Sequence, residues 1–262
     1  MNSSLRTSAS GMMAQQQMID VIANNLANVN TTGFKRSRVN FEDVLYETVQ
    51  GGHAAQPEGA ETTGPVQIGK GVRVAAVQRL HTQGALEATQ RTLDVAIEGD
   101  GFFQVERPDG PTASTRDGSL CLAESGALVT NGGYPLLPAI SIPQEATSIS
   151  IGPEGTVSVS TSGSSSPVEV GRLELARFLN PNGLLSVGEN QYLETDASGQ
   201  PVTGFATEDG MGRLLQGSLE TSNVEMVQEM TDMIAAQRAY EINAKAITAG
   251  DEMMQVMNGI IR

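Results

Sequence analysis

The sequence predicts an α+β protein whose long N- and C-terminal helices pair as a coiled coil, with an inserted antiparallel β domain and an extended β-hairpin or loop linker. The distributions of three residue types along the 262-residue chain predict this arrangement. All 11 prolines and 26 of the 29 glycines lie between Gly33 and Gly217. The 11 methionines lie near the two ends, and none lies between Met18 and Met211. Because proline and glycine disfavour helices, the ends are expected to be helical and the middle to form strands and turns.

Three regions are expected from this partition. They are a terminal helical region, an extended linker region with an insertion at about residues 46–70, and a β-rich outer domain. The terminal helical region comprises residues 1–32 and 223–262. The linker region comprises residues 33–84 and 208–222, and the outer domain comprises residues 85–207.

Charge is distributed unevenly among these regions. The chain has a formal net charge of −14, and residues 85–207 hold 15 acidic and five basic residues. This acidic excess argues against binding of a phosphate backbone, so no nucleic-acid partner is expected. The one basic cluster, Lys35–Arg38, is interpreted either as a turn satisfied by acidic neighbours or as an inter-subunit salt-bridge site.

The first helix is expected over residues 4–31. Ser3 or Ser4 can cap its start, and Gly33 can close it in a left-handed conformation. One seam of this helix has an apolar residue at every seventh position: Leu5, Met12, Ile19 and Leu26. The companion seam is more polar and includes Gln15, and polar seam residues cost stability while they fix the register. A helix with so little apolar surface needs a partner.

The second helix is expected from about residue 224 to residue 259. Its seam repeats every seven residues without a break: Met226, Met233, Tyr240, Ile247, Met254 and Ile261. Heptads sustained over this length favour coiled-coil packing. The seam residues of both helices are the predicted subunit-packing residues, and the helices pair with each other, with other subunits, or both. A helix pair buried inside one globular monomer is the alternative.

The middle of the chain alternates short apolar runs with turn signals. Strands are expected at residues 72–77, 94–97 and 102–105, with glycine-containing turns roughly ten residues apart. Such spacing is typical of an antiparallel β domain. Residues 50–64 have almost no large apolar side chain, so they are expected to form a loop or a long hairpin.

No catalytic, cofactor-binding or metal-binding residues are predicted. The segment Gly64–Gly71 has P-loop spacing, but glycine stands at its last position, where Ser or Thr would hold Mg²⁺. The two histidines, His53 and His81, are interpreted as surface or packing residues. A single cysteine, Cys121, excludes an intrachain disulfide and a cysteine-cluster metal site. Its apolar neighbours predict that it is a small buried residue.

Targeting signals are not evident in the sequence. No stretch approaches 18 consecutive apolar residues, and the first residues lack the apolar segment of a signal peptide. We therefore expect no membrane insertion and no cleaved signal peptide. Two other functions would leave different signals in the sequence. A secreted adhesin or pilus-like filament would be favoured by a signal peptide or by disulfides. A cell-wall hydrolase would be favoured by a histidine that lies beside Ser or Asp.

Five segments resemble signature motifs of the bacterial flagellar rod and hook proteins. Ala23–Lys35 is similar to their N-terminal motif, through Asn25, Asn28, Thr31, Gly33 and Phe34. Glu220–Val224 and Gln237–Asn243 are similar to their C-terminal motif, through Ser222, Asn223, Gln237, Arg238 and Tyr240. Asp94–Phe103 and Leu128–Gly133 resemble central motifs of the family. One departure is Leu120, where the family usually has Phe.

The resemblance implies a structural axial subunit, without a cofactor, that is exported unfolded through the flagellar type III apparatus. Such subunits form a helical homo-oligomeric tube, with the paired terminal helices lining it and the β domain outside. The implied partners are the proximal rod proteins, the hook protein, and the peptidoglycan and outer-membrane ring proteins along a rod that crosses the periplasm.

The linker region is most similar to that of the distal-rod branch of the family. The similarity lies in Phe41–Tyr46 and Gly69–Arg73, which flank the insertion. That insertion, at about residues 46–70, is expected to stiffen a drive shaft that transmits motor torque to the hook. A proximal rod or short hook subunit is the alternative within the family.

Overall fold

The computed structural model describes residues 3–50, 66–108, 110–161 and 167–260 of the chain. Two long helices and mostly antiparallel strands make up these residues, so the predicted α+β class is confirmed. The chain divides into two compact units. Unit 1 comprises Met1–Leu26, Ser37–Gln78 and Met226–Arg262, and unit 2 comprises Ala27–Arg36 and Arg79–Glu225.

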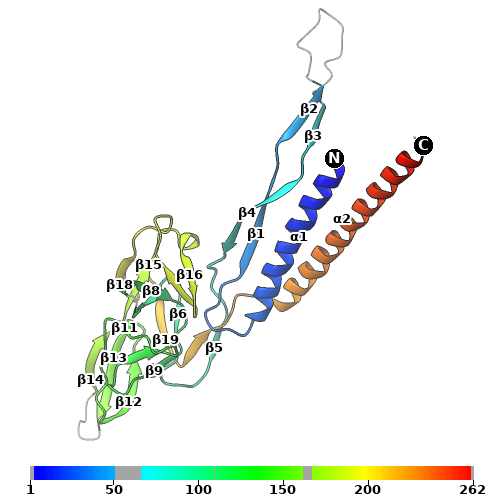
Figure 1. Ribbon diagram of the computed structural model, residues 1–262. Helices are drawn as coiled ribbons and strands as arrows, with labels where there is room; N and C mark the ends of the chain where they lie inside the picture. The colour runs from blue at the N-terminus through cyan, green and yellow to red at the C-terminus, as the bar shows by residue number, and fades with distance from the viewer. Residues whose placement is uncertain (1–2, 51–65, 109, 162–166, 261–262) are drawn as a thin grey trace, which may run out of the picture. The chain divides into compact units, whose positions relative to one another are not determined.

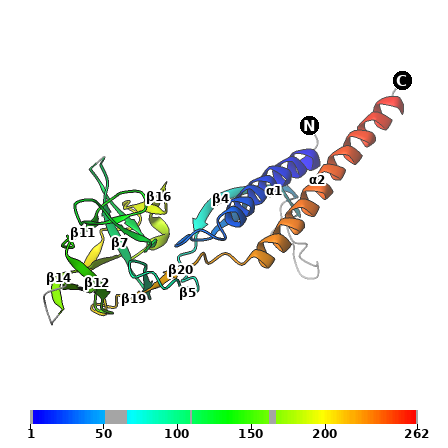
Figure 2. The same cartoon turned by 90° about the horizontal axis from the view of Figure 1, so that it is seen from below.

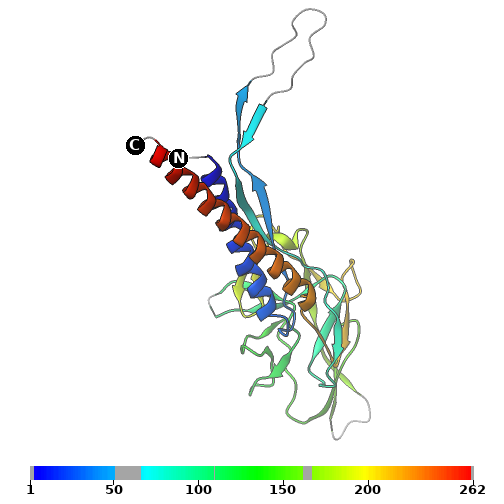
Figure 3. The same cartoon turned by 90° about the vertical axis from the view of Figure 1, so that its right-hand side faces the viewer.

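Unit 1 contains both helices, which lie side by side (Figures 1 and 3). Helix α1 spans Ser3–Ala27, and helix α2 spans Met226–Ile260. The expected end of α1 at residue 31 is wrong, because Thr31 instead makes a turn in which its N–H donates to the Asn28 carbonyl at 3.1 Å. The Thr31 hydroxyl also donates to Asn28 Oδ1 at 3.2 Å, and asparagine side chains of this kind compete with helical hydrogen bonds. In the described part of the chain, neither helix is long and apolar enough to cross a membrane.

The two helices run antiparallel and approach each other through small and polar residues. A Cβ added to Gly250 would come within 2.8 Å of Leu5 Cδ2, and one added to Gly11 would come within 3.1 Å of Asn243 Nδ2. Toward the start of α2, the side-chain amide of Asn25 donates to Glu229 Oε2 at 3.1 Å. The two glycines therefore allow a close approach of the helices.

A β-ribbon completes unit 1 and lies beside α1 (Figures 1 and 2). Strand β1 (Ser37–Asp43) neighbours β4 (Val72–Arg79), and β2 (Tyr46–Gln50) pairs antiparallel with β3 (Val66–Gly69). Strand β4 contains the strand expected at residues 72–77. The ribbon is attached to α1 where the Val72 N–H donates to Ser10 Oγ at 3.3 Å. Most of the loop expected at residues 50–64, together with His53, lies outside the described residues.

Unit 2 is built from short strands and one short 3-10 helix. The elements are β5 (Leu86–Ala88), β6 (Val95–Glu98), β7 (Phe102–Glu106), β8 (Thr112–Thr115), β9 (Leu120–Leu122), β10 (Leu128–Thr130), β11 (Leu136–Leu137), β12 (Ala146–Ile151), β13 (Thr156–Thr161), β14 (Val168–Arg172), β15 (Glu174–Arg177), η1 (Pro181–Gly183), β16 (Leu185–Gly188), β17 (Gln191–Leu193), β18 (Val202–Phe205), β19 (Arg213–Gln216) and β20 (Ser218–Glu220).

The strands of unit 2 form one large sheet and several small ones. The large sheet has the order β16-β17-β8-β7-β15-β18, with β11 paired to β7, and a second sheet has the order β12-β13-β14. Two-stranded pairs join β9 to β10, β6 to β19 and β5 to β20. The strands expected at residues 94–97 and 102–105 correspond to β6 and β7, which pair with β19 and β8 rather than with each other.

The main hydrophobic core of the described residues lies in unit 2. It joins inward-facing residues of the strands, such as Phe103, Val157 and Leu175. Leu120, the departure from the motif that the chain resembles, is fully buried in this core. The prediction that Cys121 is buried is wrong, because the side chain is only half-buried. Successive residues of a strand face opposite sides, and Leu120 occupies the core side of β9.

Candidate assembly surfaces and a buried charged junction

The predicted subunit-packing residues are placed differently on the two helices. The four on α1 are all half-buried: Leu5, Met12, Ile19 and Leu26. On α2, Met233 and Ile247 are half-buried, whereas Met226, Tyr240 and Met254 are exposed. Ile261 lies outside the described residues. Part of the predicted α2 seam is therefore accessible to a neighbouring molecule, and its role in subunit packing stays a prediction.

A different heptad of α2 faces α1. Its members are spaced by seven residues: Glu229, Ala236, Asn243 and Gly250. Glu229 accepts the hydrogen bond that Asn25 donates. Asn243 and Gly250 lie against residues of α1, and Ala236 is buried between these contacts. Sequence reasoning missed this face because small and polar residues give a weak hydrophobic signal. Their regular spacing, with Gly11 in the opposite helix, was the signal available.

Large apolar side chains remain exposed along α2. We call these residues the α2 apolar strip: Met226, Val227, Met230, Ile234, Tyr240, Ile242, Met253, Met254 and Val256. Single exposed apolar residues are common on soluble proteins, but an extended set on one element marks an interaction surface. These side chains are distributed around much of α2 and leave its apolar area accessible to another molecule.

Asn25, from the N-terminal motif, joins three elements of unit 1. Its Nδ2 donates to the Ser37 carbonyl at 2.8 Å and to Glu229 Oε2 at 3.1 Å. Its Oδ1 accepts from the Ser37 N–H at 2.9 Å. The side chain is buried, and its amide therefore connects α1 to the start of β1 and to α2. Among the C-terminal motif residues, Gln237 and Arg238 are exposed on α2, and Arg238 pairs with Glu241 at 2.9 Å.

Residues from both ends of the chain meet in unit 2. The Gly33 N–H donates to the Glu220 carbonyl at 2.8 Å. Asn223 Oδ1 accepts from the Arg36 N–H at 2.7 Å, and Asn223 Nδ2 donates to the carbonyls of Leu80 and Thr82. The segments around residues 34, 81 and 222 are therefore held together by one asparagine side chain. Ser222 supports this turn by accepting from the Val224 N–H at 3.3 Å.

Gly33 has a backbone conformation and surroundings that exclude other residues. Its φ is +66°, in the left-handed region that glycine adopts without cost. A Cβ at this position would lie 2.9 Å from backbone atoms of Arg116 and Asp117. The next residue, Phe34, is buried, and the Arg79 guanidinium carbon lies 5.7 Å from the centre of its ring. The N-terminal motif thus packs against the loop that follows β8.

A buried charged junction lies at the centre of this meeting point, formed by Lys35, Arg116 and Glu220. Lys35 Nζ lies 2.5 Å from Glu220 Oε1 and donates to the Thr82 carbonyl at 2.8 Å. Arg116 Nε lies 3.3 Å from Glu220 Oε2. Exposed fractions are 0% for the Lys35 side chain, 1% for Glu220 and 4% for Arg116. Lys35 therefore has an acidic partner in its own chain, which matches the first interpretation of the basic cluster.

Electrostatics of the junction follow from its burial. Burial lowers the pKa of Lys35, and the Glu220 carboxylate opposes that shift. Burial likewise lowers the pKa of Arg116. A buried ion pair of this kind adds little net stability, but removal of one partner leaves an uncompensated charge and is strongly destabilising. The junction therefore makes the fold of unit 2 depend on residues from both ends of the chain.

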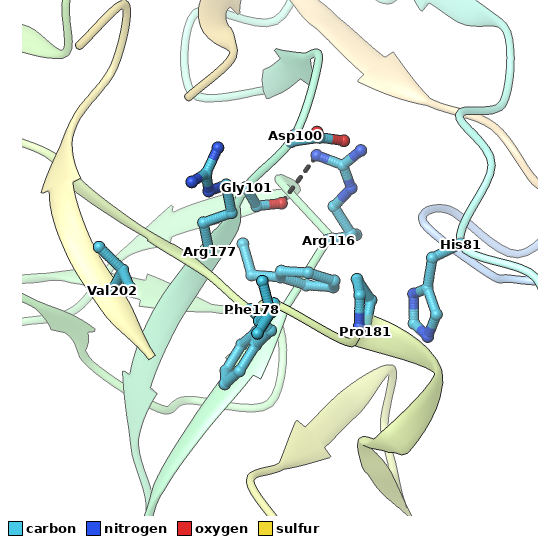
Figure 4. A pocket seen from close by; sticks show the side chains of 10 residues that line it. His81, Asp100, Gly101, Arg116, Arg177, Phe178, Pro181 and Val202 are labelled. Carbon is cyan, nitrogen blue, oxygen red and sulfur yellow. Dashed lines mark hydrogen bonds between the residues drawn. The ribbon is translucent and has the colours of Figure 1, made fainter. Parts of the chain in front are cut away.

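His81 lies beside this junction, in the wall of a pocket of about 340 Å³ (Figure 4). Its ring packs edge-on against Phe102 and Tyr192, with centroids 5.7 and 5.4 Å apart. Burial lowers its pKa to about 4, and the charges of Lys35, Arg79 and Arg116 add to the shift. The interpretation of His81 as a packing residue agrees with these contacts. Within the described residues, no group of His, Cys, Asp and Glu is arranged to hold a metal ion.

Three family descriptions match the chain. Residues 5–35 match the family described as flagella basal body rod protein, and residues 215–260 match the C-terminal family of flagellar basal body rod FlgEFG proteins. Residues 96–159 match the D1 domain of the flagellar hook protein FlgE/F/G. Together with the α+β fold and the motif contacts, these matches define the class of flagellar rod and hook proteins.

Full-length relatives narrow this class. A flagellar basal-body rod protein FlgG of Borreliella burgdorferi is 49% identical and covers 98% of each chain. FlgG proteins of Caulobacter vibrioides and Bacillus subtilis are 46% and 42% identical, over 96% and 99% of each chain. The chain belongs to the FlgG family of flagellar basal-body rod proteins, the structural subunits of the distal rod.

Proposed function

We propose that the chain assembles helically with copies of itself into the rigid hollow shaft of the distal rod, which transmits motor torque to the hook. The observation that carries this proposal is the α2 apolar strip, whose nine large side chains are exposed in a single chain. Apolar area left in water is unfavourable by about 25 cal/mol per Å². Contact with α-helices of neighbouring copies would remove this area from water.

We also propose that α1 and α2 pair as a coiled coil, with the pair lining the tube and the β-rich outer domain, residues 85–207, outside. The antiparallel contacts at Gly11, Asn25 and Gly250 support the pairing. The Asn25–Glu229 hydrogen bond would fix the register of the pair, since a buried polar contact penalises any shifted alignment. The predicted seam residues would then divide between the intrachain contact and contacts with other copies.

The insertion at about residues 46–70 is proposed to stiffen the shaft by contacting neighbouring subunits. Residues 51–65 lie outside the described residues, so the support comes from the strands that flank them. Leu45, Tyr46, Val66 and Ile68 are all exposed in the described part of the ribbon. Deletion of residues 46–70 is expected to give curved or short rods in electron micrographs, and unchanged straightness and length would contradict this role.

The remaining partners follow from family membership. We propose that the shaft contacts the proximal rod proteins, the hook protein, and the peptidoglycan and outer-membrane ring proteins, and that the subunit is exported by the flagellar type III apparatus without a cleaved signal peptide. The family is one of structural rod proteins, so no catalytic activity is proposed. A proximal rod or short hook subunit is less supported, because relatives of 42–49% identity are named FlgG.

Electron microscopy of the concentrated full-length chain tests the proposed assembly. Straight hollow tubes are expected, whereas curved tubes would favour a hook-like role and the absence of tubes at any concentration would contradict self-assembly.

Circular dichroism at low concentration gives a second test. Residues 1–32 and 223–262 are expected to be largely unfolded in the free subunit and helical in the tube, because their seams bury little apolar surface without neighbours. Full terminal helicity in the dilute subunit would contradict this.

A further inference from the structure

The pocket beside His81 has the properties of a binding site for a side chain from outside unit 2. Phe102 and Phe178 are buried and form part of its wall, with ring centroids 5.7 Å apart. Its rim carries Leu179, which is 96% exposed, and Val202, which is 53% exposed. A concave site with an aromatic wall and exposed apolar groups at its rim is typical of a pocket that is filled on association.

Arg177 places a positive charge at this pocket (Figure 4). Among the described residues of unit 2, it is the basic side chain for which no hydrogen bond or ion pair is found. The others all have polar partners: Lys35, Arg36, Arg79, Arg91, Arg107, Arg116, Arg172 and Arg213. Gly210 lets the chain pass close to the guanidinium, since a Cβ there would lie 2.8 Å from Arg177 Nη1.

The other basic groups of the pocket are already committed. Arg116 donates to the carbonyls of Gly101 and Gly99, both at 2.8 Å, and pairs with Glu220. His81, with a pKa lowered to about 4, is neutral at physiological pH. Arg177 is therefore the basic group of the pocket lining for which the described residues provide no hydrogen bond or ion pair, and Asp100 is the acidic group of the same lining.

We propose that this pocket receives a carboxylate side chain of a second copy of the chain, which pairs with Arg177 while an adjacent apolar group covers Leu179 and Val202. Charge complementarity identifies the occupant. Unit 2 has 19 acidic and nine basic residues, so each copy presents carboxylates in excess of its own partners. A planar guanidinium binds a carboxylate through two parallel hydrogen bonds, which fixes orientation as well as charge. This inference rests on the proposed helical assembly and names one contact within it.

The first test compares Arg177→Gln with Arg213→Gln in the full-length chain. Both variants remove one positive charge from unit 2, but Arg213 forms an exposed ion pair with Glu98. Arg177→Gln is expected to raise the critical concentration for assembly at least about tenfold, because a truncated buried charge pair weakens association by more than 1.4 kcal/mol. Arg213→Gln is expected to change it by less than about twofold. Equal critical concentrations for the two variants would overturn the proposal, provided that their monomers unfold at the same urea concentration.

The second test identifies the occupant and does not depend on an arginine variant. A photo-crosslinking amino acid at position 179 is activated in tubes formed from isotopically light and heavy chains. Crosslinks between a light and a heavy chain, to a peptide that contains Asp or Glu, are expected. Crosslinks confined to one chain, or to segments without an acidic residue, would overturn the proposal. If the wild-type chain forms no tubes, the proposed function itself fails, and this contact fails with it.

Discussion

The two units differ in how completely each one buries its own apolar residues. In the described part of the chain, unit 1 buries three apolar side chains, Ala14, Ile22 and Ala236, and unit 2 buries 25. Exposed large apolar side chains show the opposite distribution, with 16 in unit 1 and seven in unit 2. Within the described residues, unit 2 therefore buries most of its apolar side chains in one core, whereas unit 1 leaves most of its large apolar side chains accessible, as interaction surfaces do.

The polar interiors of the two units also differ. Unit 1 is held by the neutral amide of Asn25, which bonds Ser37 and one carboxylate, Glu229. Unit 2 encloses the fully charged junction of Lys35, Arg116 and Glu220. Both units thus bury a carboxylate, since Glu229 is also nearly inaccessible to solvent. The two units therefore differ in how their buried carboxylates are paired: Glu229 of unit 1 accepts from an amide, whereas Glu220 of unit 2 faces two cations.

The largest expected effect is the loss of tube formation when an exposed apolar residue of α2 is replaced by a charged one. Ile234 of the α2 apolar strip is 58% exposed, and Val168 on β14 of unit 2 is 53% exposed. Ile234→Glu is expected to abolish tube formation, because a carboxylate would be buried against neighbouring apolar side chains. Val168→Glu is expected to leave tube formation intact. Sedimentation of concentrated protein measures both, and equal sedimentation of the two variants would remove the proposed distinction between the units.

The next effect concerns the stability of unit 2. Glu220→Ala leaves Lys35 and Arg116 buried without their carboxylate, and it is expected to lower the free energy of unfolding by about 3–5 kcal/mol. Glu208→Ala is the matched control, because Glu208 is 53% exposed and its ion pair with Arg172 is expected to contribute less than about 1 kcal/mol. Urea unfolding followed by circular dichroism measures both. If Glu220→Ala lowers the free energy of unfolding no more than the control does, the junction does not stabilise unit 2.

Gly33 gives a smaller effect that tests the contact between the N-terminal motif and the loop that follows β8. Gly33→Ala is expected to destabilise unit 2 by about 2–3 kcal/mol, from the left-handed backbone and from the clash with Arg116. Gly199 is the control, because its φ is +74° and a Cβ there meets no atom within 4 Å. Gly199→Ala is expected to cost about 1 kcal/mol in the same urea experiment. Equal losses of unfolding free energy in the two variants would mean that backbone conformation, and not packing against residue 116, is the reason for glycine at position 33.

The sequence predicted the elements of each unit better than the contacts that join them. Heptads and turn spacing predicted both helices and the β-rich middle, because these signals are local. The Lys35–Glu220 pair joins residues 185 positions apart in a chain with 30 acidic residues, so no local rule could select that partner. The face of α2 that meets α1 was missed for another reason. Its contacts depend on the absence of side-chain volume at Gly11 and Gly250, which hydrophobic periodicity does not register.

The smallest effect is a pH dependence that belongs to unit 2. His81 has a pKa of about 4 in the folded chain and an ordinary value of 6.5 when unfolded. Between these values the unfolded chain binds more protons, so the stability contributed by neutral His81 is complete above pH 6.5 and is lost as the pH falls toward 4. The loss is expected to be about 2 kcal/mol, since the side chain is not fully buried.

His81→Gln isolates this contribution, because glutamine does not titrate while every other group of the chain is retained. The free energy of unfolding of the wild type should fall more steeply than that of the variant between pH 6.5 and pH 4, and the two curves should run parallel above pH 7. The causes of the lowered pKa all lie within unit 2, namely burial and the charges of Lys35, Arg79 and Arg116. Parallel curves across the whole range would show that His81 is solvated, and that the core of unit 2 is less closed than the contrast with unit 1 requires.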